Sequence, residues 1–252
     1  MRTFSRRSVL LTASLLVPGA ARAQGLLEQG RNLLKQAPGG SSGSSKSAGS
    51  GLSQGEIGSG LKEALSVASR RVVDRTGKVD GFNGDPAIRI PLPGPLQKLE
   101  GALKTVGAGG MLSDLQLKMN RAAEQAAPKA LDIFRNAISK MSISDAKAIL
   151  SGPNDAATQY FRKQTSGDLT TAFKPVVDRS LADVGAVQSF KAVQGRASGI
   201  PLAGQEVQSL NLTDYTVQKA LDGLFHYLGT EEAAIRTNPA ARTTDLLKKV
   251  FA

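Results

Sequence analysis

The sequence predicts a mainly all-α fold, a compact multi-helix bundle with one short extended segment near residues 82–93. Two observations lead to this prediction. Apolar residues recur at intervals of three and four over nearly the whole chain after residue 52, which is the spacing of one helix face. The composition is globular, with 40% apolar and 21% charged residues, and its 4% aromatic content leaves Leu, Ala, Val and Ile to fill the core.

The N-terminal 23 residues have the pattern of a signal peptide. A basic stretch from Met1 to Arg7 precedes about ten apolar residues from Ser8 to Val17, and Ala21-Arg22-Ala23 places small residues where a signal peptidase cuts. We therefore expect cleavage before Gln24 and localisation in the periplasm. A bilayer is crossed by roughly 20 apolar residues. No stretch comes close to that length, so we expect no transmembrane segment in the mature form.

The signal has features of the twin-arginine export route. Ser5-Arg6-Arg7-Ser8-Val9-Leu10 resembles the export signature in which paired arginines precede a moderately apolar stretch. Paired arginines also occur in ordinary Sec signals, so Sec export remains the alternative. Either route delivers the protein to the same compartment.

Residues 24–51 are expected to form an amphipathic arm and a flexible linker. The arm has leucines at helical spacing and could lie on a membrane surface. These leucines are Leu26, Leu27, Leu33 and Leu34. Residues 38–51 are mostly Gly, Ser, Ala and Lys, which bury too little apolar surface to fold, and this composition predicts the linker. The helical domain should then span residues 52–252.

The domain begins with a helix that is expected to end near Gly77. Its apolar face is formed by Ile57, Leu61, Leu65, Ala68, Val72 and Val73. Residues 81–86 combine Gly, Asn, Asp and Pro, which favours turns. Residues 88–93 contain two prolines and should be extended, because proline disfavours α geometry in the residue before it. A short strand or an edge hairpin is expected in this segment.

Helices resume at residues 95–106, and three glycines separate this helix from the next. Ser113 or Asp114 is expected to cap that next helix, which carries apolar residues at helical spacing as far as Met141. Pro128 should kink it or start a new first turn.

The second half of the domain is predicted to contain several shorter helices. The residues expected to cap them are Ser144, Asn154 or Asp155, Thr213 and Thr230. Their expected ranges are 144–152, 155–165, 169–184, 213–228, 230–238 and 245–250. Pro175 should kink the third of them. Glu231 and Glu232 lie in the first turn of the fifth, where carboxylates stabilise the positive end of the helix dipole.

Charge and residue types exclude several classes of function. Removal of the signal would lower the formal charge from +11 to +7, because four arginines leave with it. This excess includes no run of five basic residues, so we expect no nucleic-acid partner. The chain has no Cys, which excludes disulfides, thiolate metal sites, thiol nucleophiles and lipid attachment at the cleavage site.

The histidine and glycine patterns match no metal or phosphate-binding motif. The single histidine, His226, excludes a His-rich metal centre, and no Glu-x-x-His is present. Gly107-Ala108-Gly109-Gly110 lacks the Gly-Lys-Ser/Thr of a phosphate loop. The loop around Gly81 and Gly84 lacks the carboxylate spacing of a calcium site. We therefore predict no metal and no cofactor.

Polar residues beside apolar helix faces are the candidates for a ligand site. Asn120 and Glu124 are four residues apart on one face of a helix, so their side chains are expected to lie inside the bundle. The residues that such a site could combine are Asn120, Arg121, Glu124, Asp145, Tyr160, Arg162, Glu231 and Arg236. Thr158 and Glu232 are also polar residues at the edges of apolar helix faces. The alternative is that these groups form structural ion pairs and helix caps.

Six short strings occur in order along the domain. They are Asp80-Gly81-Phe82 with Ile88-Arg89-Ile90-Pro91-Leu92-Pro93, Met119-Asn120-Arg121-Ala122-Ala123-Glu124, Asp145-Ala146 with Ile149-Leu150-Ser151-Gly152, Ala156-Ala157-Thr158-Gln159-Tyr160-Phe161, Lys219-Ala220-Leu221-Asp222-Gly223-Leu224-Phe225, and Glu231-Glu232 with Ile235-Arg236 and Asn238-Pro239. Together they resemble the bacterial envelope family called domain of unknown function 4197. The resemblance implies an exported, helix-rich domain without an established activity, and supplies no catalytic residues.

Two functions remain open from the sequence. The first is a non-enzymatic binding or scaffolding domain that holds a small molecule, a lipid or another envelope protein in a helical groove. That groove would be lined by Met111, Met119 or Phe134. The second is a metal-independent enzyme that requires Glu124 to lie within hydrogen-bond reach of Tyr160 or Arg236, with Asn120 in the same cluster. We expect binding or scaffolding, because no set of residues specifies a reaction.

Overall fold

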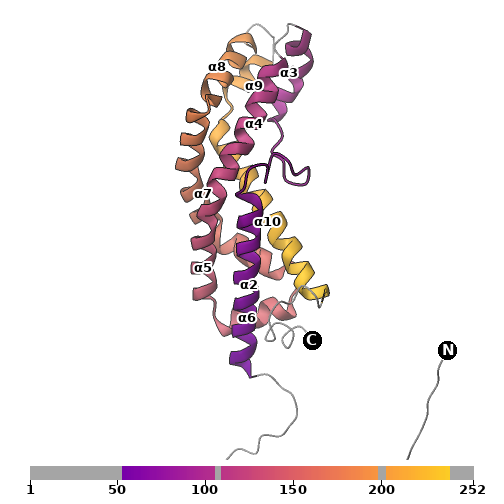
Figure 1. The fold of residues 1–252 in the computed structure, drawn as a ribbon, viewed down its shortest axis with the longest axis vertical. Coiled ribbons are helices and arrows are strands. Elements are labelled where there is room, and N and C mark those ends of the chain that lie inside the picture. The colour runs from indigo at the N-terminus through magenta and orange to yellow at the C-terminus, as the bar shows by residue number, and fades with distance from the viewer. Residues whose placement is uncertain (1–52, 106–108, 198–202, 239–252) are drawn as a thin grey trace, which may run out of the picture. The chain divides into compact units, whose positions relative to one another are not determined.

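A computed structural model describes residues 53–105, 109–197 and 203–238 of the chain. Within these ranges the backbone forms α-helices, one 3₁₀ turn (η1, Ala127–Lys129) and no β-strand, which confirms the all-α fold (Figure 1). The helices are α2 (Gln54–Thr76), α3 (Gly94–Thr105), α4 (Gly109–Ala126), α5 (Ala130–Lys140), α6 (Ile143–Ser151), α7 (Ala156–Asp183), α8 (Ala186–Ala197), α9 (Ala203–Gln208) and α10 (Leu212–Thr237). The predicted signal, arm, linker and last helix lie outside the described residues.

Helices that are distant in sequence lie side by side in the bundle. α7 packs against α10, α4 and α5, and α2 packs against α10, α5 and α6. α3, α8 and α9 gather at one end of the bundle, and α6 lies at the other (Figure 1). None of the described helices combines the length and the apolar character needed to cross a membrane.

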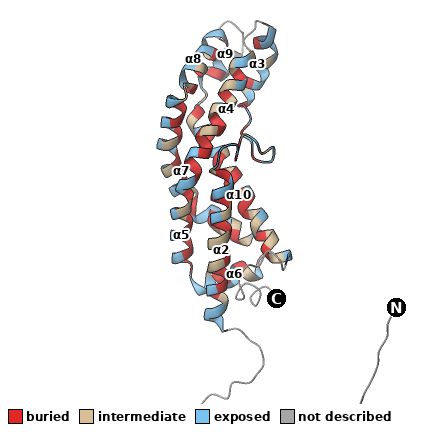
Figure 2. Cartoon of the chain, viewed as in Figure 1, coloured by how far each residue is buried: buried red, intermediate tan, exposed pale blue. Residues whose placement is uncertain are grey.

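The core runs through the whole bundle and is mainly aliphatic, as the composition predicts (Figure 2). The Phe134 ring contacts the Phe161 and Phe225 rings edge-on, with ring centroids 5.3 and 6.4 Å apart. Met119 and Phe134 are fully buried, and Met111 is partly buried against the same core. Packing therefore fills the groove that these three residues were expected to line.

Several helix starts differ from those predicted by capping residues. Ser142, and not Ser144, caps α6: its hydroxyl accepts the Asp145 N–H at 3.0 Å, and the Asp145 carboxylate accepts the Ser142 N–H at 2.9 Å. Ser113 and Asp114 lie inside α4, which already begins at Gly109. α8 and α9 lie in a region for which no helix was predicted from the sequence.

Two predicted helix breaks are absent, so α7 and α10 are longer than expected. α7 continues through Thr165, and α10 continues through Thr230. The Thr165 hydroxyl donates to the Phe161 carbonyl at 2.7 Å, and the Thr230 hydroxyl donates to the His226 carbonyl at 3.1 Å. Because threonine can bond its own helix four residues back as well as cap a new one, the presence of Thr230 did not locate a helix start.

The predicted extended segment does not form a strand or hairpin. Residues 77–93, called the loop 77–93 from here on, consist of bends and turns followed by irregular backbone, and they bulge from the bundle between α2 and α3 (Figure 1). The prolines of the loop have no N–H to donate to a strand partner. Both backbone groups of Ile90 pair with the Asn120 side chain instead. A side chain of α4 thus takes the place of a neighbouring strand.

Pro175 lies exposed in the interior of α7, where it cannot donate to the carbonyl four residues earlier. Pro175→Ala is therefore expected to stabilise the protein by about 1–3 kcal/mol, measured as the free energy of unfolding in urea. Pro128→Ala is the matched control, because Pro128 occupies the first turn of η1, where proline is well tolerated. An equal gain in both variants would contradict this explanation.

Candidate functional site

The predicted site residues do not converge on one place. One group lies on α4, holds the loop 77–93, and consists of Asn120, Arg121 and Glu124. A second group lies on α10, contacts the junction between α6 and α7, and includes Arg236. The remaining candidates lie apart from both groups, and they are Asp145, Tyr160, Arg162 and Glu231.

The Asn120 amide acts as a strand partner for the loop. Its Oδ1 accepts the Ile90 N–H at 2.8 Å, and its Nδ2 donates to the Ile90 carbonyl at 3.0 Å. Nδ2 also donates to the Gln116 carbonyl of α4 at 2.8 Å, and the Gln116 side chain donates to the Ile90 carbonyl at 3.1 Å. Asn120 and Ile90 are both fully buried. Without Asn120, the N–H of Ile90 would lose its partner in a place that water does not reach.

Glu124 and Arg121 hold the first half of the loop. The buried Glu124 Oε1 accepts the N–H groups of Phe82 and Asn83 at 3.1 and 3.0 Å. Arg121 donates to Glu124 Oε2 at 2.8 Å and to Asp80 at 2.8 Å. Asp80 has a left-handed backbone conformation, with a φ of 64°, so this bond stabilises a turn that few residue types adopt. The Glu124 carboxylate, which was a candidate to bind a ligand, therefore binds the loop instead.

A third set of contacts, from α2 and α10, was not predicted. Tyr227 donates its hydroxyl to Asp85. Arg75 donates to Asp85 at 3.0 Å and to the Tyr227 oxygen at 2.8 Å, and its guanidinium lies 3.9 Å from the centroid of the Tyr227 ring. The only sequence signal was Asp85 in a turn segment. That signal does not reveal partners 10 and 142 residues away.

The contacts among Asp85, Tyr227 and Arg75 shift the pKa values of the Asp85 carboxyl and the Tyr227 phenol in opposite directions. The Tyr227 hydrogen bond, together with Arg75 and against the effect of burial, lowers the pKa of Asp85. Burial and the bond to Asp85 raise the pKa of Tyr227. The carboxyl therefore stays ionised as an acceptor, and the phenol stays protonated as a donor.

Tyr227→Phe is expected to make the protein more sensitive to acid. A carboxyl whose pKa is lowered by folding stabilises the fold above its unfolded value of about 3.9, and this contribution is lost as the pH falls through the lower folded value. Without the Tyr227 hydroxyl the pKa of Asp85 rises, so the midpoint of acid unfolding, followed by circular dichroism, should move to higher pH. Stability at pH 7 should fall by about 1–3 kcal/mol.

Tyr215→Phe is the matched control for this prediction. The Tyr215 hydroxyl donates to the Pro91 carbonyl at 3.1 Å, and a carbonyl does not titrate. Its removal should lower the free energy of unfolding by the same amount at pH 7 and at acid pH, whereas the loss in Tyr227→Phe should shrink as the pH falls through the pKa of Asp85. If the loss in Tyr227→Phe did not depend on pH, Asp85 would not be the group responsible.

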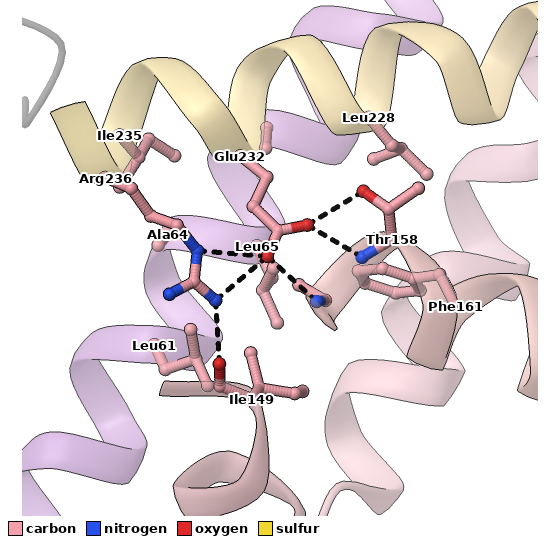
Figure 3. Close-up of a pocket in the computed structure, with 12 residues that line it drawn as sticks. Leu61, Ala64, Leu65, Ile149, Thr158, Phe161, Leu228, Glu232, Ile235 and Arg236 are labelled. Atoms are coloured by element: carbon pink, nitrogen blue, oxygen red, sulfur yellow. Dashed lines mark hydrogen bonds and ion pairs between the residues drawn. The ribbon is translucent and has the colours of Figure 1, made fainter. Parts of the chain in front are cut away.

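The second polar group joins α10 to the junction between α6 and α7 (Figure 3). The Glu232 carboxylate accepts the N–H groups of Ala157 and Thr158, at 2.9 and 2.8 Å. Arg236 donates to the Ile149 carbonyl at 2.7 Å and to Glu232 at 3.0 Å. The carboxylate thus faces the positive N-terminus of α7, and the guanidinium faces the negative C-terminus of α6.

Glu232 supplies the cap that α7 lacks in its own sequence. Asp155 occupies the N-cap position, but its side chain makes no capping hydrogen bond. The expectation that Glu231 and Glu232 stabilise the start of their own helix is wrong, because both lie late in the continuous α10. Glu231 instead pairs with Arg71 of α2 at 3.1 Å.

A narrow apolar cavity lies beside this junction. Its walls come from α2, α6, α7 and α10 and include Leu65, Phe161, Ile235 and the ion pair itself (Figure 3). Its volume is about 20 Å³, enough for one water-sized molecule. A cavity of this size does not hold an organic ligand.

Two open pockets flank the loop 77–93. The first has a volume of about 420 Å³ and lies between the loop and Arg75. The second has a volume of about 310 Å³ and lies between the loop and α10. Gly223 permits this close approach, because a methyl group at its position would lie 2.6 Å from the Phe82 ring and 3.2 Å from Ile88 Cβ. Loops fixed on a rigid scaffold are frequent binding surfaces, and both pockets have the volume of a small-ligand site.

Comparison with known proteins identifies the family. A family model described as "Protein of unknown function (DUF4197)" matches residues 51–252. The chain belongs to the DUF4197 family. No curated protein and no solved structure matches it. Membership of DUF4197 therefore confirms the resemblance without assigning an activity.

The six strings that carry the DUF4197 resemblance meet in two places. Three strings meet where α4 and α10 hold the loop. They are residues 80–82 with 88–93, residues 119–124, and residues 219–225. The other three strings meet at the junction between α6 and α7, and they are residues 145–152, 156–161 and the described part of the last string, 231–238. The resemblance thus rests on residues that join one element to another.

The remaining site residues predicted for this DUF4197 chain have separate structural roles. Asp145 caps α6. Arg162 lies 3.6 Å from Asp222 and 4.5 Å from the centroid of the Phe225 ring. Tyr160 is partly buried, and burial together with the charge of Asp145 raises its pKa. Among the residues that the structure describes, no cluster of His, Asp and Glu side chains could hold a metal ion.

Proposed function

We propose that this chain is an exported periplasmic protein that binds a partner or ligand without catalysing a reaction. Its recognition surface would be the loop 77–93 with the two pockets beside it. One observation carries the proposal: side chains of α4, α2 and α10 hold the inner side of the loop, while its outer side lines open pockets. A loop held in this way is suited to recognition, because binding orders few additional groups.

The enzymatic alternative has less support. It required Glu124 to lie in a cleft beside Tyr160 or Arg236. The Glu124 carboxylate instead bonds the loop and Arg121, while Arg236 bonds Glu232. Neither group could exchange a proton with a substrate without releasing part of the fold.

A photo-activated cross-linking residue at Val79 tests the recognition surface in intact cells. Val79 lies in the loop and is 73% exposed, so the replacement should not disturb the core. Irradiation should attach a distinct molecule, and the added mass would distinguish a small molecule, a lipid and an envelope protein. The control carries the same group at Ile143 on α6, which is 55% exposed. Identical products at both positions, or none at Val79, would overturn the proposal.

Export through the twin-arginine route predicts that Arg6→Lys combined with Arg7→Lys retains the protein in the cytoplasm. The paired arginines are recognised together, so the exported fraction should fall to near zero. Cell fractionation and the mass of the N-terminus measure this fraction, since exported chains should begin at Gln24. Arg2→Lys is the control outside the motif. Normal export of the double variant would assign the protein to the Sec route, and a wild-type chain that keeps Met1 would refute export.

A further inference from the structure

We infer that the pocket between the loop 77–93 and α10 binds a phosphate group. This inference rests on the proposed binding function and names the ligand chemistry of one of the two loop pockets. The pocket volume of about 310 Å³ is near the lower end of the range for small-ligand sites. A soluble phosphate ester and the phosphate of a lipid headgroup would present the same chemistry to it.

The charged side chains around this pocket have an excess of positive charge. Arg89, Lys219 and Asp222 line it. Asp222 lies 3.6 Å from Lys219 and 3.6 Å from Arg162, which stands behind it on α7. The charged side chains that line the pocket therefore carry one net positive charge, and Arg162 offsets part of the Asp222 charge from outside the pocket. An excess of positive charge favours an anion such as phosphate.

Arg89 is the group best placed to bind the phosphate. Its side chain is exposed and has no hydrogen bond or ion pair with any described residue. Its backbone is fixed, because the Arg89 N–H donates to the Asp85 carbonyl at 2.8 Å and Asn120 holds both backbone groups of Ile90. The guanidinium therefore extends from a fixed point, and its planar set of donors fits two oxygens of one phosphate.

α10 supplies the opposite wall of the pocket from a single helix face. Lys219, Gly223 and His226 follow one another at intervals of four and three residues, so they lie one turn apart. Gly223 brings the loop close to the helix, and the exposed His226 ring offers another hydrogen-bonding group. Binding would mainly order the ends of Arg89 and Lys219, which keeps its entropic cost low.

The larger loop pocket and the cavity beside Glu232 lack this charge pattern. The larger loop pocket contains Arg75 and Lys78 but also Asp80 and Asp85, so its charges balance. Arg75 and Asp85 already form an ion pair at 3.0 Å. The cavity beside Glu232 has room only for a water-sized molecule. The charge pattern therefore favours the pocket against α10.

Calorimetric titration of inorganic phosphate into the purified full chain, at constant ionic strength, tests the inference. Combining Arg89→Ala with Lys219→Ala should weaken binding about tenfold or more. The control combines Lys163→Ala with Lys191→Ala, which removes the same charge from exposed positions on α7 and α8. Equal weakening in both pairs would mean unspecific attraction and would overturn the site. If the first pair does not fold, as judged by circular dichroism, the single variant Arg89→Gln replaces it with the same expected loss.

Two further probes separate the sources of the phosphate. Binding of glycerol phosphate that depends on Arg89 and Lys219 would indicate a soluble ester. Binding only to phosphatidylglycerol vesicles, and not to phosphatidylcholine vesicles, with the same dependence, would indicate a lipid headgroup. Failure of inorganic phosphate, the ester and the vesicles would overturn the inference. A product specific to Val79 would still support the recognition surface in that case, so the two proposals fail separately.

Discussion

Glu232→Ala is expected to destabilise the protein by about 3–5 kcal/mol, because it removes one partner of a buried ion pair. The Glu232 and Arg236 side chains are 6% and 12% exposed, so solvent would replace the carboxylate only in part. The N–H groups of Ala157 and Thr158 would lose their acceptor, and Arg236 would lose its counter-charge. Thermal unfolding should occur about 6–20 °C lower in a domain of this size.

Glu231→Ala is the matched control for this prediction. Its carboxylate is adjacent in sequence and pairs with Arg71, but both side chains are partly exposed, and such pairs contribute about 0–1 kcal/mol. Glu232→Gln keeps an oxygen acceptor without the charge, and its stability should lie between those of the wild type and Glu232→Ala. If Glu231→Ala cost as much as Glu232→Ala, the buried contacts at the junction would not explain the loss.

Asn120→Ala is expected to cost about 2–4 kcal/mol, because it removes three hydrogen bonds and leaves the buried N–H of Ile90 unpaired. Its second effect should be local. The loop 77–93 should open more often than the helices around it. Trypsin should therefore cleave after Lys78 or Arg89 sooner than in the wild type, and the Ile90 amide should exchange with solvent faster.

Gln116→Ala is the control for Asn120→Ala. The Gln116 side chain donates one hydrogen bond to the same Ile90 carbonyl, which would keep its bond from Asn120. The expected loss is below about 1 kcal/mol, with no change in cleavage of the loop. If Asn120→Ala also left cleavage unchanged, Glu124 and the contacts around Asp85 would hold the loop without Asn120.

Helix content was predictable because it depends on local pattern. The apolar spacing of α2 and the glycine after it located that helix to within a few residues. The same reasoning failed at Thr165, where a helix was expected to end, and at Thr230, which was expected to cap a new one. A threonine such as Thr230 caps a new helix or bonds back into its own, and only the helix that continues through it decides between the two.

The sequence by itself determined the all-α class, the family and the inward placement of Asn120 and Glu124, because apolar periodicity and short strings are properties of neighbouring residues. Tertiary structure alone decided what these polar groups bind. Glu124 meets the loop across 41 residues of sequence, and Glu232 meets α7 across 75. Local propensity carries no information over such separations. A polar residue on an inner helix face has the same sequence pattern whether it binds a ligand or the protein's own backbone, and only packing brings that backbone to it.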